Sequence, residues 1–152
     1  MEEKKFIIEQ VAAISSGIAD TVRGLSAKIG HNYKELTDKD FVEMIESPNT
    51  FLFVAKDMDG KIAGMITLLV FRIPYVKKGY LDDLVVDEAF RGMGIAKSLM
   101  EHAVSFAKEK GVAYVDLTAR PRREEGNSLY EKFGFQKRDT NVYRLIIDYA
   151  EV

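Results

Sequence analysis

The chain has 152 residues, of which 47% are hydrophobic and 30% are charged, and its formal net charge is −2. This near-neutral balance gives no overall field that would draw the molecule to nucleic acid or to an anionic membrane. The sequence contains no cysteine, which excludes disulfides, thiolate nucleophiles and cysteine-bound zinc, and its two histidines are too few for a histidine-rich metal site.

No apolar stretch is long enough to predict a membrane-spanning helix, and residues 1–6 lack the pattern of a signal peptide. Glycine and proline are scattered, without a linker, a repeat or a low-complexity tract. Two domains within this length would each be short of core, so we expect a single domain over residues 1–152. The expected location is the cytoplasm.

The chain begins with a predicted strand and helix. Residues 6–13 predict the strand, and hydrophobic residues recur at helical spacing over residues 14–29. Ser15 or Ser16 is placed to start this helix, and Gly30 to end it.

A second helix and a β-hairpin follow. Thr37 is expected to cap the helix, and Ser47-Pro48 to end it. Residues 51–55 and 62–73 are apolar runs joined around Asp59-Gly60, a pattern typical of a β-hairpin.

The middle of the chain predicts a strand–helix–strand unit. Residues 80–86 form the first strand, an amphipathic helix extends from Ile95 to Lys110-Gly111, and residues 112–117 form the second strand. Such a unit has parallel strands and a right-handed crossover.

The end of the chain predicts a short helix and another hairpin. The helix covers residues 124–133 and ends at Gly134. The hairpin pairs residues 135–138 with residues 142–149 across residues 139–141. Hairpins at both ends and a crossover between them predict a mixed α/β sheet.

The turn between the first strand of this unit and its helix reads Arg91-Gly92-Met93-Gly94-Ile95-Ala96. The first N–H groups of a helix lack internal partners, and no Ser, Thr, Asp or Asn stands at the turn to cap them. Such amides suit a phosphate, although a tight turn with water on its amides is the alternative. A P-loop does not match, and the dinucleotide motif fails at its sixth position, which is Lys97.

This turn matches the Arg/Gln-x-x-Gly-x-Gly/Ala signature of the GNAT superfamily of N-acetyltransferases, which it resembles. The flanking Asp82-Asp83-Leu84-Val85-Val86 and the later Leu129-Tyr130-Glu131-Lys132-Phe133-Gly134-Phe135 are similar to the same family, in the same order and at the usual spacing. The resemblance is tight from about Tyr80 to Tyr143. It implies a mixed sheet of about six to seven strands flanked by about four helices.

The resemblance also implies the reaction, which is acetyl transfer from acetyl-CoA to a primary amine by direct attack. The backbone amides of Gly92, Met93, Gly94, Ile95 and Ala96 would bind the cofactor's pyrophosphate. Arg91 would add charge near the phosphates, or is simply a solvated arginine.

The same resemblance assigns the strand before the turn to the pantetheine arm. The backbone of Leu84, Val85 and Val86 would pair with that arm and hold the thioester carbonyl, while their side chains contribute to the core.

Two side chains are candidates for proton transfer. The resemblance implies that Tyr130 is the general acid for the leaving thiolate, against the alternative of an ordinary core aromatic residue. Asp82 is the candidate base or amine-orienting group, against the alternative of a solvated charge. Adjacent residues on a strand point to opposite faces, so only one of Asp82 and Asp83 would line the site unless a bulge intervenes.

One departure from the family pattern lies before Tyr130. Many members have Asn and Ala where this chain has Arg123 and Gly126. The cluster of Arg120, Arg122 and Arg123 would meet a cofactor phosphate or an acidic substrate group, or would be a solvated loop for at least two of the three.

The acceptor is a small-molecule amine or a protein amine, and the sequence does not distinguish them. His31 lies in a loop where acceptors of the family often enter, and His102 is expected on a solvated helix face. Exposed apolar residues of the last strand (Val142, Leu145 and Ile147) suggest a homodimer. The competing functions are a non-catalytic acyl-CoA binder or sensor and a dinucleotide-binding domain.

Overall fold

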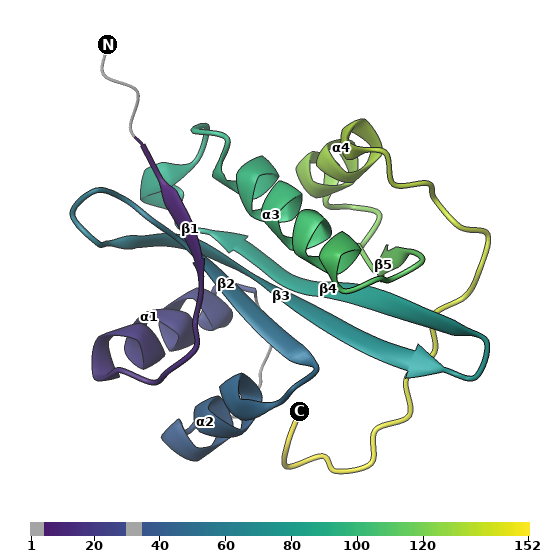
Figure 1. The fold of residues 1–152 in the computed structure, drawn as a ribbon, viewed down its shortest axis with the longest axis horizontal. Helices are drawn as coiled ribbons and strands as arrows, with labels where there is room; N and C mark the ends of the chain where they lie inside the picture. The colour runs from purple at the N-terminus through teal and green to yellow at the C-terminus, as the bar shows by residue number, and fades with distance from the viewer. Residues whose placement is uncertain (1–4, 30–34) are drawn as a thin grey trace.

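The computed structural model describes residues 5–29 and 35–152. Within them, five strands form one sheet in the order β1-β2-β3-β4-β5 (Figure 1). The strands are β1 (Ile7–Gln10), β2 (Thr50–Lys56), β3 (Ile62–Ile73), β4 (Val76–Val86) and β5 (Val115–Leu117). Neighbours from β1 to β4 are antiparallel, and β4 pairs with β5 in parallel. The fold is therefore mixed α/β, as predicted.

Helices cover both faces of this sheet. They are α1 (Ser16–Ala27), α2 (Asp38–Glu46), the short 3₁₀ helix η1 (Glu88–Phe90), α3 (Ile95–Glu109) and α4 (Glu124–Phe133). Figure 1 shows α3 and α4 over one face and α1 and α2 over the other. The prediction of about four flanking helices is confirmed.

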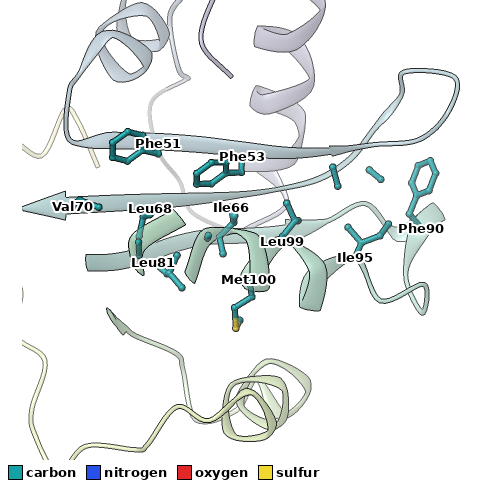
Figure 2. Packing of buried hydrophobic residues seen from close by; sticks show 14 residues of the cluster. Phe51, Phe53, Ile66, Leu68, Val70, Leu81, Phe90, Ile95, Leu99 and Met100 are labelled. Carbon is teal, nitrogen blue, oxygen red and sulfur yellow. The ribbon is translucent and has the colours of Figure 1, made fainter. Parts of the chain in front are cut away.

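The two faces of β2 belong to two separate hydrophobic clusters. Phe51 and Phe53 pack toward α3, whereas Leu52 and Val54 pack toward α1 and α2. A strand covered on both faces has no polar side, which explains the nearly continuous apolar run in the sequence. Figure 2 shows the α3-side cluster, to which Ile66, Leu68 and Leu99 also belong.

The predicted helix starts are confirmed. The Oγ of Ser15 accepts the N–H of Ile18 at 3.4 Å, and Ser15 is the N-cap of α1. Thr37 caps α2 through a reciprocal capping box with Asp40. α1 ends at Ala27, and the expected stop at Gly30, like His31, lies outside the described residues.

Three predicted strands have wrong boundaries. β1 ends at Gln10 rather than at residue 13, because its pairing with β2 ends at Gln10↔Phe53. β4 begins at Val76 rather than Tyr80, because its first residues pair with the end of β3, from Ile73↔Val76 to Val70↔Gly79. β5 begins at Val115 rather than Val112, because its pairing with β4 starts at Gly79↔Val115.

The prediction of a final hairpin was also wrong. The described sheet therefore has five strands rather than the expected six to seven. Residues 135–138 and 142–149 belong to no strand of the described chain. Residues 139–141 contain no glycine to form a tight turn, and an isolated hairpin without a third strand is marginal in water. Neither half of the predicted hairpin pairs with a strand of the described sheet, although Phe135 packs against the α3-side cluster.

Gly64 permits the close contact between β3 and β4. A Cβ at this position would lie 2.8 Å from the carbonyl oxygen of Val85 and 3.3 Å from Leu99 Cδ1. The first distance is shorter than real Cβ contacts allow, and a backbone oxygen in a paired strand cannot move aside cheaply.

We therefore expect Gly64→Ala to lower the free energy of unfolding by about 1–3 kcal/mol through overpacking. The matched control is Gly24→Ala on α1, where no atom lies within 4 Å of the new Cβ. That control should gain about 0.5–1 kcal/mol from helix propensity. Chemical denaturation measures both, and a Gly64→Ala protein as stable as the wild type would contradict the prediction.

Candidate functional site

The site begins where β4 and β5 part. Their pairing covers only Gly79↔Val115, Tyr80↔Asp116 and Leu81↔Leu117. β4 continues to Val86, so residues 82–86 have a strand neighbour only on the β3 side of the described sheet. The opposite backbone edge of these residues is available to an extended ligand such as a pantetheine arm.

The side chains of this segment pack in the core, as expected. Leu84 and Val86 are partly buried against the α3-side cluster. Val85 is partly buried on the other face of the sheet, against the cluster that includes Val22 of α1 and Phe41 of α2. Backbone and side chains therefore have separate roles, because the core holds the strand in place while one backbone edge remains unpaired.

A β-bulge interrupts β4 at the two aspartates. Thr67 pairs with Asp82 and Met65 with Val85, so Ile66 on β3 stands opposite two residues of β4. Asp83 has a φ of 51°, in the left-handed region that non-glycine residues rarely adopt. The bulge interrupts the alternation of side chains between the two faces of the strand. The sequence analysis required such a bulge for both aspartates to reach the site.

The bulge brings the two carboxyl groups together. The N–H of Asp83 donates to Asp82 Oδ1 at 2.9 Å. Desolvation by the surrounding chain, followed by the negative charge of Asp82, raises the pKa of Asp83 to about 6. Asp83 can thus exchange a proton near neutral pH, a property that the sequence analysis did not assign to it and that no local pattern indicates.

Tyr130 lies on α4 and is half-buried. Its ring packs edge-on against Phe135, with centroids 6.1 Å apart. No hydrogen bond to its Oη is found among the described residues, so the phenol is free to donate a proton. Burial raises the pKa of Tyr130; the charge of Arg123 lowers it and that of Asp82 raises it. The Tyr130 ring therefore packs in the core while its hydroxyl has no protein partner among the described residues. The negative charge of Asp82 is near enough to affect the pKa of Tyr130.

Arg123 is the member of the arginine cluster with a defined contact. Its guanidinium donates to the carbonyl oxygen of Ile29 at 3.2 Å, which ties the start of α4 to the end of the α1 region. Asn127 fastens the same loop, because its amide donates to the carbonyl oxygens of Arg120 and Arg123. The side chains of Arg120 and Arg122 are exposed. Sequence reasoning missed Asn127.

The glycine turn lies between η1 and α3 and presents uncapped amides. Gly92 and Gly94 have φ values of 79° and 77°, and Gly94 is the N-cap of α3 without a side-chain hydrogen bond. Within the described chain, no acceptor receives the N–H groups of residues 92–97. Such a run of unpaired donors at a positive helix end fits a diphosphate.

Neighbouring residues hold this turn in place but leave the space beside its two glycines open. Asp87 caps η1 by accepting the N–H of Ala89 at 3.0 Å, and this bond, together with Lys28 at 3.3 Å, lowers the pKa of Asp87. No atom lies within 4 Å of a Cβ placed at Gly92 or Gly94. Arg91 and Met93 are exposed beside the turn, and Ile95 is buried beneath it. The turn is therefore held by η1 and the buried Ile95, and the space beside Gly92 and Gly94 is open.

A shallow groove along α4 is separate from this site. Tyr130 does not line it; the lining residues are Glu124, Glu125, Ser128, Leu129 and Lys132.

Among the described residues, no helix has the length and apolarity needed to cross a bilayer. No group of three or more His, Asp or Glu side chains is placed to hold a metal ion in this part of the chain.

Residues 23–135 match the family described as the Acetyltransferase (GNAT) family. The chain belongs to this GNAT family. The prediction drawn from the glycine turn and its flanking motifs is confirmed at the level of the family.

Two curated acetyltransferases are similar to this chain over part of their length. Streptothricin acetyltransferase of Streptomyces lavendulae is 30% identical over 90 residues, which cover 59% of this chain and 47% of the relative. N-alpha-acetyltransferase 30 of Schizosaccharomyces pombe is 31% identical over 85 residues, 56% of this chain and 57% of the relative. The chain thus spans about half the length of these relatives.

A solved structure shows the same fold over nearly the whole chain. It is an aminoglycoside acetyltransferase from an uncultured soil metagenomic sample, in complex with trehalose. The match has a TM-score of 0.79 at 22% identity and covers 93% of this chain and 96% of that one. The architecture of this GNAT protein is therefore that of known acetyltransferases.

The raised pKa of Asp83 predicts a pH-dependent stability. The pKa is about 6 in the folded protein against 3.8 for the ordinary group, so folding favours the protonated form. The stability that Asp83 contributes is present at acid pH and is lost as the pH rises through about 6. Asp83→Asn stays neutral at every pH, and Asn tolerates the left-handed backbone.

We expect Asp83→Asn to match the wild type near pH 4 and to exceed its stability above pH 6. With an allowance for solvent screening, the gain is about 1 kcal/mol, or about 2–4 °C in melting temperature. Melting curves from pH 4 to 8 measure it, with Asp59→Asn in the β2–β3 turn as the control. A constant difference across this range would show that Asp83 does not titrate as described.

Proposed function

We propose that this GNAT protein transfers an acetyl group from acetyl-CoA to a primary amine, as a single cytoplasmic acetyltransferase domain. One observation carries the proposal: the unpaired edge of β4 leads directly, through η1, to the uncapped amides of residues 92–97. Together they form a line of backbone donors that suits an extended pantetheine arm ending in a diphosphate.

In this proposal each part of the cofactor has its own contact. The amides of Gly92, Met93, Gly94, Ile95 and Ala96 bind the pyrophosphate, and the exposed Arg91 adds positive charge beside it. The backbone of Leu84, Val85 and Val86 pairs with the pantetheine arm. When bound, acetyl-CoA supplies a thioester carbonyl as the acetyl donor.

The reaction needs two proton transfers. The amine nitrogen forms a bond to the carbonyl carbon and loses a proton, while the bond from that carbon to sulfur breaks and the thiolate gains a proton. Tyr130 donates to the thiolate. Its raised pKa keeps the phenol protonated at neutral pH, and its Oη has no competing hydrogen bond in the described structure.

Asp82 is the proposed base or amine-orienting group. Its negative charge raises the pKa of Tyr130, which supports a role of both side chains in one site. Asp83 is the second candidate, because a pKa of about 6 allows it to be ionised in part at neutral pH and to take up a proton. Direct attack requires no covalent enzyme intermediate, in keeping with a chain that has no cysteine.

The acceptor is a small-molecule amine or a protein amine. The two curated relatives have names that point to different acceptors, streptothricin in one and an alpha-amino group in the other. A binder or sensor of acyl-CoA without catalysis would keep the amide turn but has no need of a free phenol at Tyr130. The free hydroxyl therefore favours the enzyme.

Thermal unfolding tests the cofactor site. Acetyl-CoA at about 100 times its Kd should raise the stability by about 2.7 kcal/mol, or about 5–11 °C, whereas NAD should not. Gly94→Ala should lose this ligand-induced shift, because its Cβ would enter the space above the amides. The absence of a shift for the wild type at millimolar acetyl-CoA would overturn the proposal.

The matched control for Gly94→Ala is Gly60→Ala. Gly60 has a φ of 82°, close to the 77° of Gly94, and both have open space around the new Cβ. Both variants should lose about 1–2 kcal/mol to backbone strain. Only Gly94→Ala should also lose the response to acetyl-CoA, which separates strain from binding.

Tyr130→Phe tests the general acid. The variant should lower kcat by about 10²-fold or more, because the thiolate then leaves unprotonated. It should keep the thermal shift with acetyl-CoA, since no cofactor contact is removed. Tyr75→Phe, at a side chain that is 80% exposed, is the control. CoA release in the presence of an accepted amine gives the rate, and an unchanged kcat would remove Tyr130 from the mechanism.

A further inference from the structure

The side chain of Tyr130 runs back along α4 toward the start of the helix. A Cβ placed at Gly126 would lie 3.8 Å from the Tyr130 Oη and 3.7 Å from its ring. The hydroxyl therefore rests over the first turn of α4, as helical side chains lean toward the N-terminus. Arg123 is the N-cap of this helix and directly precedes that turn. A cation and the phenol therefore share one end of α4.

Charges of opposite sign act on this phenol from two elements. Arg123 on α4 lowers the pKa of Tyr130, and Asp82 at the bulge of β4 raises it. Both effects require short distances, because exposed charges more than about 10 Å apart are screened at ordinary ionic strength. The phenol is thus bordered by one guanidinium and one carboxylate.

Most of the Arg123 guanidinium is not used by the protein. Of its several N–H donors, one is occupied within the described chain, by the carbonyl oxygen of Ile29 at 3.2 Å. No carboxylate of the described residues forms an ion pair with it, although Glu124 and Glu125 follow it in the chain. The Ile29 contact positions the guanidinium and leaves its other donors open to an anion, which such a planar fork binds through paired hydrogen bonds.

An anion at Arg123 fits the acceptor better than the cofactor. The amides proposed for the pyrophosphate are those of residues 92–96, at the start of α3. In the proposed reaction Tyr130 serves the opposite end of the pantetheine arm, where the amine attacks and the thiolate leaves. A cation beside Tyr130 therefore faces the molecule that delivers the amine.

We propose that Arg123 determines acceptor specificity by binding an anionic group of the acceptor, so that the substrate is a small amine that also carries a carboxylate or a phosphate. This inference rests on the proposed acetyl transfer and narrows its acceptor. Arg123 holds the anion and Asp82 faces the amine, so the acceptor lies across Tyr130 with both of its charges matched. One helical turn is about 5 Å, so a molecule as small as an amino acid spans the two groups.

The first test compares acceptors that differ in this charge. The probes are the α-amino acids, β-alanine and γ-aminobutyrate, each beside its uncharged amide, and ethanolamine phosphate beside ethanolamine. CoA release from acetyl-CoA gives kcat/KM for each. The wild type should prefer the charged member of at least one pair by about 10- to 100-fold, the range for a hydrogen bond to a charged group. The pairs that show the preference distinguish carboxylate from phosphate.

Arg123→Gln removes the charge and keeps a side chain that can donate a hydrogen bond. The preference should fall by the same factor of about 10 to 100, because the charged acceptor alone loses its partner. The readout is the change in the ratio of the two rates, in which the different reactivities of the two amines cancel. Loss of the Ile29 contact or a shift of Tyr130 would lower both rates equally and leave the ratio unchanged.

Two further variants are matched to this one. Arg123→Lys keeps the charge without the planar fork and should retain part of the preference. Arg72→Gln removes an exposed arginine on β3 and should retain all of it. A ratio that stays the same in Arg123→Gln, or that falls equally in Arg72→Gln, would overturn the inference.

Binding without turnover separates this inference from the acetyl-transfer proposal. Melting curves are recorded with CoA alone and with CoA plus each acceptor of a pair. The charged acceptor should add a rise in melting temperature that its neutral partner does not, and Arg123→Gln should lose this added rise while it keeps the response to CoA. If acetyl-CoA and CoA give no shift, the proposed function fails and this inference with it. If they do, but no charged acceptor adds a shift or reacts faster than its neutral partner, this inference alone fails.

Discussion

The β-bulge in β4 is the constraint on which the rest of the site depends. Before it, β4 is held between β3 and β5; after it, β4 has only β3 as a strand neighbour in the described sheet. A bulge bends its strand and increases the local twist, and the pairing of β4 with β5 ends at Leu81, directly before it. The close packing at Gly64 holds the segment beyond the bulge against β3. Residues 82–86 thus keep one backbone edge without a strand neighbour in the described sheet.

The bulge also sets the electrostatics. Two carboxyl groups beside each other resist double ionisation, so the charge of Asp82 adds to the rise in the pKa of Asp83. The same charge raises the pKa of Tyr130, while Arg123 opposes it. Arg123 in turn holds the carbonyl oxygen of Ile29, at the end of the α1 region. The bulge, α4 and the end of the α1 region are therefore linked although they are distant in the sequence, and the charge of Asp82 favours the neutral form of the Tyr130 phenol.

The features that the sequence predicted are those with local causes. The capping of α2 by Thr37 and the stop of α4 at Gly134 depend on residues within one helical turn. The uncapped turn at Gly94 is visible for the same reason. The bulge was not predictable, because Asp83 is not the glycine that usually marks a left-handed residue. The early start of β4 at Val76 was missed because it depends on pairing with β3, and a strand boundary is decided by the neighbouring strand rather than by its own residues.

The C-terminal segment carries this reasoning one step further. Its alternation predicts a strand, but a strand forms only where a sheet edge accepts it, and residues 142–149 pair with no strand of the described sheet. β5 forms one edge of the described sheet, and α4, which carries Tyr130, has no fully buried residue. The position of the Tyr130 hydroxyl therefore depends on the contacts that hold the start of α4, where Arg123 donates to the carbonyl oxygen of Ile29 and Asn127 donates to those of Arg120 and Arg123.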